Sequence, residues 1–306
     1  MIRNVDPSAE RFLADLSRIQ ETAERAARQI SSGLRVTAPS DAPDHVGDIL
    51  QLRANLSRNT QILANLYRAK TEADTAEKSL GHSITLLDRA IVLASQGAST
   101  IVTPESRKII AGEVQGLLEQ LVADSQTVAE GRYIFSGDRD QELAYRLNLA
   151  SPTGVDRLFQ TQASRRIEHP SGQTFQAAKT AQEIFDTRNP DDTPASDNVF
   201  AAVNGLRLAL EADDQAGIEA SMAALRRASE RLNIEQSFYG AVQNKIEAAI
   251  EFGGKNNVLL ETELSARQDA DLTAAALELE RTSIHEQAAL AARARLPRTS
   301  LLDYLD

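Results

Sequence analysis

The most constraining feature of the sequence is a stretch from Val46 to about Ala98 that contains no proline. Apolar residues recur along it every three or four positions, which is typical of a helix with one buried seam. The seam comprises Ile49, Leu52, Leu56, Leu63, Leu66, Ala73, Leu80, Ile84, Leu87, Ile91 and Ala94. A helix of this extent is about 80 Å long. That exceeds what a compact domain needs, so the pattern predicts a rod.

Further helices are predicted on both sides of the middle of the chain. Thr103-Pro104 starts a helix with a capping hydroxyl and a proline in the first turn, and Gly131 is expected to end it. After residue 196 a short helix is followed by a long one over about 218–264. Gly253-Gly254 is interpreted as a bend or weak spot within it, and a last helix covers 269–296.

Between these helices the sequence changes to short β-prone runs separated by turn residues. Four strands are expected, near 143–149, 155–161, 166–168 and 174–177. The fold class is therefore mainly α: a long antiparallel helical rod or coiled coil built from both chain ends, with a small central β-rich insertion. Three divisions are predicted: 1–43 with 265–306 as terminal helices, 44–135 with 196–264 as the rod, and 136–195 as the insertion.

The two terminal helices carry narrow apolar seams. The N-terminal seam includes Phe12, Leu16, Ile19, Ile30 and Leu34, and the C-terminal one includes Leu272, Leu279 and Leu290. Beyond the last helix, Leu301, Leu302 and Leu305 are added as packing residues of the chain end. Two apolar residues per heptad are typical of a coiled-coil face that needs one or two partner helices. These residues are the candidate subunit-packing site. A core helix of a local bundle remains an equal alternative for the first helix.

A connector separates the first helix from the rod. Gly33 favours a left-handed helix end, and Pro39 moves the preceding residue out of the α region. Asp41 is expected to accept hydrogen bonds from the first amides of the next helix, and Pro43 suits its first turn. With Ser40 these residues form the candidate connector and capping site.

Composition excludes several functional classes. The net charge is −11, and the largest basic blocks are the pairs Arg165-Arg166 and Arg226-Arg227, which we interpret as solvated surface. Nucleic-acid binding is therefore not expected. The absence of cysteine excludes disulfides and thiolate metal sites. No secretory signal or membrane-spanning run is found, so membrane insertion is not expected either.

Catalytic motifs are incomplete. His285-Glu286 begins like a zinc-protease motif, but Ala289 stands where the second histidine is needed. Gly254-Lys255 lacks the rest of a phosphate loop. We therefore predict no catalytic, metal-binding or cofactor-binding residues, no cofactor and no enzymatic activity.

Several segments together resemble the bacterial flagellin superfamily, and most closely its hook–filament junction branch. They are Gln29–Arg35, Pro39–Pro43, Gly131–Gly137, Asp269–Leu272 and Ser300–Leu305. The five segments occur in the order found in that family, across both ends of the chain, and the likeness covers about residues 5–137 and 200–306. The resemblance in the β-rich insertion is loose.

The resemblance implies a structural protein that is exported without a cleaved signal and located outside the cell in the flagellum. It implies a ring of copies between hook and filament, in contact with the other junction protein and with flagellin. An export chaperone is a further expected partner, and the termini are expected to order only on assembly. Two alternatives stay open: a filament-forming flagellin, and a non-flagellar helical-rod protein in signalling or at a secretion tip.

Overall fold

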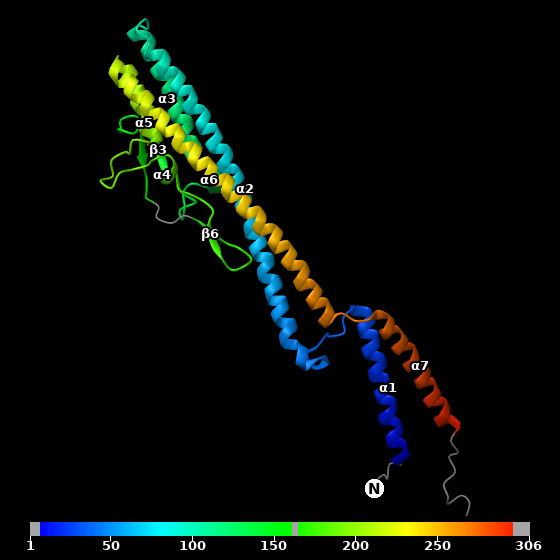
Figure 1. Cartoon of the computed structure of the whole chain (residues 1–306). Coiled ribbons are helices and arrows are strands. Elements are labelled where there is room, and N and C mark those ends of the chain that lie inside the picture. Colours follow the sequence, from blue (N-terminus) through cyan, green and yellow to red (C-terminus); the bar gives the residue numbers. More distant parts are fainter. Residues whose placement is uncertain (1–6, 161–164, 296–306) are drawn as a thin grey trace, which may run out of the picture. The chain divides into compact units, whose positions relative to one another are not determined.

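The structure, a computed structural model, describes residues 7–160 and 165–295 (Figure 1). The chain divides into two compact units. One unit comprises residues 59–256, and the other comprises the described parts of 1–58 and 257–306. The predicted fold class is confirmed, because helices from both chain ends pack together and small antiparallel strand pairs lie between them in sequence.

Four helices form the main body of the 59–256 unit. They are α2 (Pro43–Gly97) and α6 (Gln215–Gln268), each of which also contributes to the other unit, together with α3 (Pro104–Ser125) and α5 (Val199–Glu211). Their core contains fully buried leucines such as Leu80, Leu118 and Leu232. The long proline-free stretch is therefore one helix, and the apolar seam is its buried face. None of the described helices combines the length and apolar character needed to cross a bilayer.

The start of α3 follows the prediction and its end does not. The Thr103 hydroxyl accepts a hydrogen bond from the Ser106 amide at 3.3 Å, and Pro104 is the first helical residue. The helix ends at Ser125, well before Gly131. Glu130 and Gly131, both with positive φ, instead form the turn between β1 (Val128–Ala129) and β2 (Arg132–Tyr133).

The central region contains two more antiparallel strand pairs, at the four predicted positions but in most cases shorter than predicted. They are β3 (Tyr145–Leu147) with β4 (Val155–Arg157), and β5 (Arg166–Glu168) with β6 (Thr174–Gln176). A short helix that we did not predict, α4 (Ala181–Ile184), follows. Strand pairs this short need support from a core. For β3 this support comes from Tyr145, whose ring centre lies 5.3 Å from that of Phe200. Just after β2, the ring centre of Phe135 lies 5.9 Å from that of Phe185.

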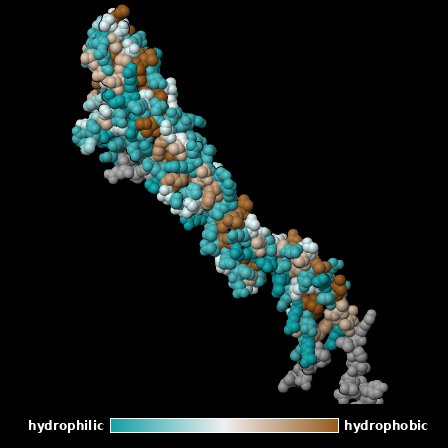
Figure 2. Space-filling model, viewed as in Figure 1, coloured by the Kyte–Doolittle hydropathy of each residue, from teal (hydrophilic) through white to brown (hydrophobic). Residues whose placement is uncertain are grey.

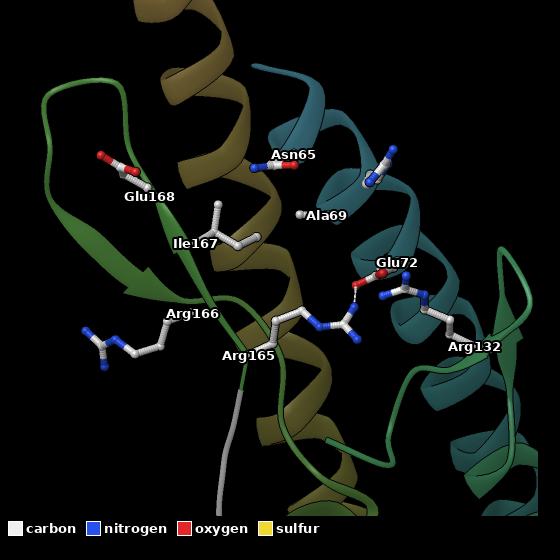
Figure 3. Close-up of a pocket in the computed structure, with 9 residues that line it drawn as sticks. Asn65, Ala69, Glu72, Arg132, Arg165, Arg166, Ile167 and Glu168 are labelled. Carbon is white, nitrogen blue, oxygen red and sulfur yellow. Dashed lines mark hydrogen bonds and ion pairs between the residues drawn. The ribbon is translucent and has the colours of Figure 1, made fainter. Parts of the chain in front are cut away.

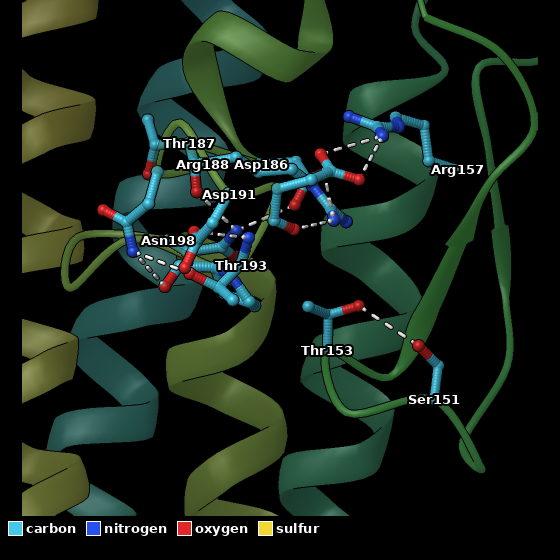
Figure 4. A network of polar contacts seen from close by, with 12 residues as sticks. Ser151, Thr153, Arg157, Asp186, Thr187, Arg188, Asp191, Thr193 and Asn198 are labelled. Atoms are coloured by element: carbon cyan, nitrogen blue, oxygen red, sulfur yellow. Dashed lines mark hydrogen bonds and ion pairs between the residues drawn. The ribbon is translucent and has the colours of Figure 1, made fainter.

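A buried polar network fixes the loop between α4 and α5 (Figure 4). The fully buried Asp186 carboxylate accepts hydrogen bonds from the Tyr145 hydroxyl at 3.0 Å, Asn198 Nδ2 at 2.8 Å and Arg188 Nε at 2.9 Å. Burial, with the nearby Asp186 charge, raises the pKa of the Tyr145 phenol far above its usual range. The Tyr145 phenol therefore stays protonated and donates its hydrogen bond, and both oxygens of the Asp186 carboxylate accept hydrogen bonds.

The glycine pair Gly253-Gly254 does not interrupt α6. Gly253 is buried, and a Cβ built there would meet Leu63 of α2 at 2.7 Å and Pro170 of the β5–β6 turn at 3.1 Å. The first glycine thus allows close packing of a neighbouring helix and a turn. The expectation that the helix has no boundary at this pair is confirmed.

Candidate assembly surface

The candidate site is a hairpin of two terminal helices, α1 (Pro7–Ser32) and α7 (Leu272–Arg295), which pack side by side (Figure 1). The helices are antiparallel. Gln20 Nε2 donates to Glu286 Oε1 at 3.0 Å, and the Arg293 guanidinium lies 5.6 Å from the Phe12 ring centre. The two helices come from opposite ends of the chain, so neither finds its partner nearby in sequence.

Small side chains close the interface between the two helices. Ala26, Ala275 and Thr282 are buried, and the Thr282 hydroxyl is satisfied by the Glu278 carbonyl at 2.8 Å. Five residues of the predicted seams are only half-buried: Phe12, Leu16, Ile19, Leu34 and Leu279. The hairpin therefore buries little apolar surface for its length, and the larger seam residues are incompletely covered.

Other predicted packing residues are not brought into this interface. Ile30, Leu272 and Leu290 have exposed fractions of 39%, 52% and 50%. Leu301, Leu302 and Leu305 lie outside the described residues. Ile30 lies in the last turn of α1, and Leu272 is the first residue of α7.

Two further exposed aliphatic residues, Leu277 and Ile284, were not predicted from the sequence; they are 47% and 58% exposed. They are one heptad apart, so they share a face of α7. At about 100° per residue that face is opposite Ala275 and Thr282 and points away from α1. Figure 2 shows apolar side chains among hydrophilic ones on the surface of the terminal hairpin. The seven-residue spacing of Leu277 and Ile284 is the sequence pattern from which this second apolar face of α7 could have been predicted.

The connector after α1 pairs with the junction between α6 and α7. Gly33 has φ +71°, as its predicted role as a helix terminator requires, and its carbonyl accepts from the Ala270 amide at 2.9 Å. The backbones of Leu34 and Asp269 form an isolated antiparallel β-bridge, and the Arg35 amide donates to the Gln268 carbonyl at 2.7 Å. Residues 269–271 are not helical, so the last helix starts at Leu272, later than predicted.

Asp41 has a different role from the predicted one. Its Oδ2 accepts from the Ala38 amide at 2.7 Å, the Thr37 amide at 2.9 Å and the Thr37 hydroxyl at 2.9 Å. It thus closes the turn that precedes it, which includes a 3₁₀ segment over Pro39–Asp41, and does not cap α2. The same residue type serves both roles, because Asp binds free amides on either side of it. Pro43 is the first residue of α2 as predicted, and Ser40 is exposed.

We expect acid to open this turn. Hydrogen bonds from the Ala38 amide, and then from Thr37, hold the pKa of Asp41 below its ordinary value of 3.8. A lowered folded-state pKa means that the charged carboxylate supports the turn above pH 3.8 and that this support is lost as the pH falls through the folded value. Asp41→Ala should remove this stabilisation of the turn at every pH. Faster amide exchange of Thr37 and Ala38 at neutral pH in this variant is the measurement; unchanged exchange contradicts the assignment.

Within the described residues no cluster of histidine and acidic side chains could hold a metal ion. The nearest approach to a catalytic arrangement is at Asp124, which binds His82 Nδ1 at 2.9 Å and the Ser83 hydroxyl at 2.7 Å. Imidazole and hydroxyl each bind the carboxylate and not one another. At this site the Ser83 hydroxyl therefore lacks the histidine partner that it would have in a Ser–His–Asp triad.

The comparisons with known proteins agree with this architecture. Residues 6–140 match the bacterial flagellin N-terminal helical region, and residues 222–305 match the bacterial flagellin C-terminal helical region. Flagellar hook-associated protein 3 of Salmonella typhimurium is 24% identical over 254 residues, 82% of this chain and 74% of that protein. Flagellin B of Helicobacter pylori is 27% identical over 164 residues, 51% of this chain and only 32% of that protein.

Two solved structures share the fold. A flagellar hook-associated protein from Vibrio parahaemolyticus is similar with a TM-score of 0.63 at 20% identity, over 75% of this chain and 100% of that one. Flagellar hook associated protein-3 from Legionella pneumophila gives a TM-score of 0.61 at 15% identity, over 71% of this chain and 98% of that one.

Proposed function

The chain belongs to the bacterial flagellin family, and from this premise we propose that it is a structural protein of the hook–filament junction. The relative from Salmonella typhimurium is named as a hook-associated protein, and this chain spans 74% of it. Flagellin B is matched over 32% of its length. The better coverage of hook-associated relatives favours the junction over a filament-forming flagellin.

The observation that carries the proposal is the incompletely covered terminal hairpin. Leu277 and Ile284 are exposed on the side of α7 away from α1, and Leu13 of α1 is 60% exposed. An isolated helix pair that fully buries mainly alanine and threonine gains little from packing, whereas each buried leucine or isoleucine contributes about 1.5–3 kcal/mol. Neighbouring subunits that cover these residues would supply the missing stabilisation.

In this proposal, the packing residues of α1 and α7 contact other copies in a ring. The other junction protein lies on the hook side and flagellin on the filament side, and an export chaperone holds the chain before assembly. The protein acts outside the cell, reaches the flagellum without signal cleavage, and has no enzymatic activity. Its function is to join two assemblies by helix packing.

A deletion strain tests the function. Cells that lack the chain should build hooks, fail to attach filaments, lose motility and release unassembled flagellin into the medium, because flagellin is still exported. The intact gene supplied in trans should restore filaments. If flagellin disappears from cells and medium together, the chain is a filament flagellin. If filaments and motility persist, the flagellar assignment is wrong.

A further inference from the structure

Four arginines surround a cavity of about 350 Å³ in the 59–256 unit. Arg68 comes from α2, Arg132 from β2, and Arg165 and Arg166 from the start of β5. The remaining lining residues are Asn65, Ala69, Glu72, Ile167 and Glu168. With Glu72 and Glu168 counted, the four arginines leave the lining with a net charge of +2, in a chain whose net charge is −11.

Two of the arginines are neutralised by Glu72, which lines the cavity (Figure 3), and by Asp140, which is not a lining residue. Arg165 forms an ion pair with Glu72 and a second one with Asp140 at 3.2 Å, and Arg132 binds Asp140 at 3.3 Å. The dashed line in Figure 3 marks the ion pair between Arg165 and Glu72. These pairs fix β2 and the start of β5 against α2, and their charges balance.

The other two arginines are not neutralised by any carboxylate in the described part of the chain. Arg166 donates only to the carbonyl and hydroxyl of Thr174, at 3.3 and 3.4 Å, and Arg68 is exposed. From the sequence we interpreted Arg165-Arg166 as solvated surface. Arg166 is exposed, in agreement with that interpretation, whereas Arg165 is half-buried and belongs to the ion-pair network.

We propose that this cavity, the arginine cleft, receives a carboxylate from a second copy of the chain. The inference rests on the proposed ring of copies. Copies that each carry −11 repel one another, so contact between them is favoured where cationic groups meet acidic ones. The planar guanidinium fork matches a carboxylate, and such charge-assisted hydrogen bonds are stronger than neutral ones. Arg68 and Arg166 are the groups that this contact engages.

Arg68→Lys provides a direct test in isolated flagella. A carbodiimide joins a lysine amine to a carboxylate that touches it, without adding a spacer. Flagella are assembled from a mixture of heavy-nitrogen-labelled and unlabelled copies, so a link between copies appears as a mixed-isotope peptide pair. The native Lys70–Glu247 pair, at 2.5 Å, should link in every sample and serves as the reagent control.

We expect the lysine introduced by Arg68→Lys to link to an aspartate or glutamate of another copy. The yield should be at least tenfold above that from Arg226→Lys, a matched exposed position outside the cleft. Links from the introduced lysine to a different flagellar protein overturn the second copy as the occupant. If that lysine forms no links although the chain is present in the flagella and Lys70 reacts, the cleft contact is overturned and the junction function stays intact. Absence of the wild-type chain from flagella contradicts the proposed function instead.

Discussion

A chain carrying Leu277→Asp and Ile284→Asp is expected to fold normally and yet to be at least tenfold depleted from isolated flagella. Both side chains are about half exposed on α7 and point away from α1, so the free protein loses little packing. In the proposed assembly the same positions lie under a neighbouring subunit. Burying an unpaired carboxylate there costs several kcal/mol, and two of them should prevent stable packing.

Motility, and immunodetection of the chain in purified flagella and in the medium, measure this effect. The matched control is Ser283→Asp with Gln287→Asp, which adds the same charge at exposed polar positions of the same helix. The control should assemble like the wild type. If the leucine and isoleucine variants also enter flagella normally, this face of α7 is solvent-exposed in the assembly and the packing proposal fails.

Asp186→Ala is expected to lower the free energy of unfolding by about 3–5 kcal/mol, the cost of breaking a buried ion pair from one side. The carboxylate is fully buried and accepts from Tyr145, Asn198 and Arg188. Without it, the buried Tyr145 hydroxyl loses its acceptor and the Arg188 guanidinium loses its buried counter-charge, whereas Asn198 keeps the Thr187 carbonyl and Arg188 keeps Asp192. The loss should be larger than that of most single substitutions.

Urea unfolding of the full chain, followed by the helical circular dichroism signal, measures this loss. Asp138→Ala removes an exposed carboxylate from the same central region and should change stability by less than about 0.5 kcal/mol. Asp186→Asn keeps the size and one acceptor, so it should fall between the two. A loss of less than about 1 kcal/mol in Asp186→Ala contradicts the importance of the network.

The sequence predicted the elements whose signals are local. The start of α2 at Pro43, the capped start of α3 at Thr103 and the left-handed Gly33 each follow from one or two neighbouring residues. The end of α3 was missed because Gly131 is an equally good residue for a hairpin turn as for a helix end. Whether Gly131 ends a helix or forms a hairpin turn depends on the pairing of β1 with β2. The local sequence pattern of a helix end does not contain that information.

The candidate site was predictable in part. The α1 seam was recognisable because apolar spacing reports a buried face, and Phe12, Leu16 and Ile19 lie on it. A single seam cannot show that α7 has a second exposed apolar face, because that requires knowing which side α1 covers. The Asp186 network and the arginine cleft join residues far apart in sequence, and no local pattern specifies such contacts.

The pairing of α1 with α7 sets an order of events during folding. Residues 33–271 lie between the two helices, so the loop that their contact closes includes all of the 59–256 unit. Closing a long flexible loop costs entropy that grows with its length by about 0.6 kcal/mol per doubling. Prior folding of the intervening unit shortens the effective loop. The α1–α7 hairpin should therefore close late, after that unit has folded. During synthesis, α1 is made long before α7 and has no partner until α7 is complete.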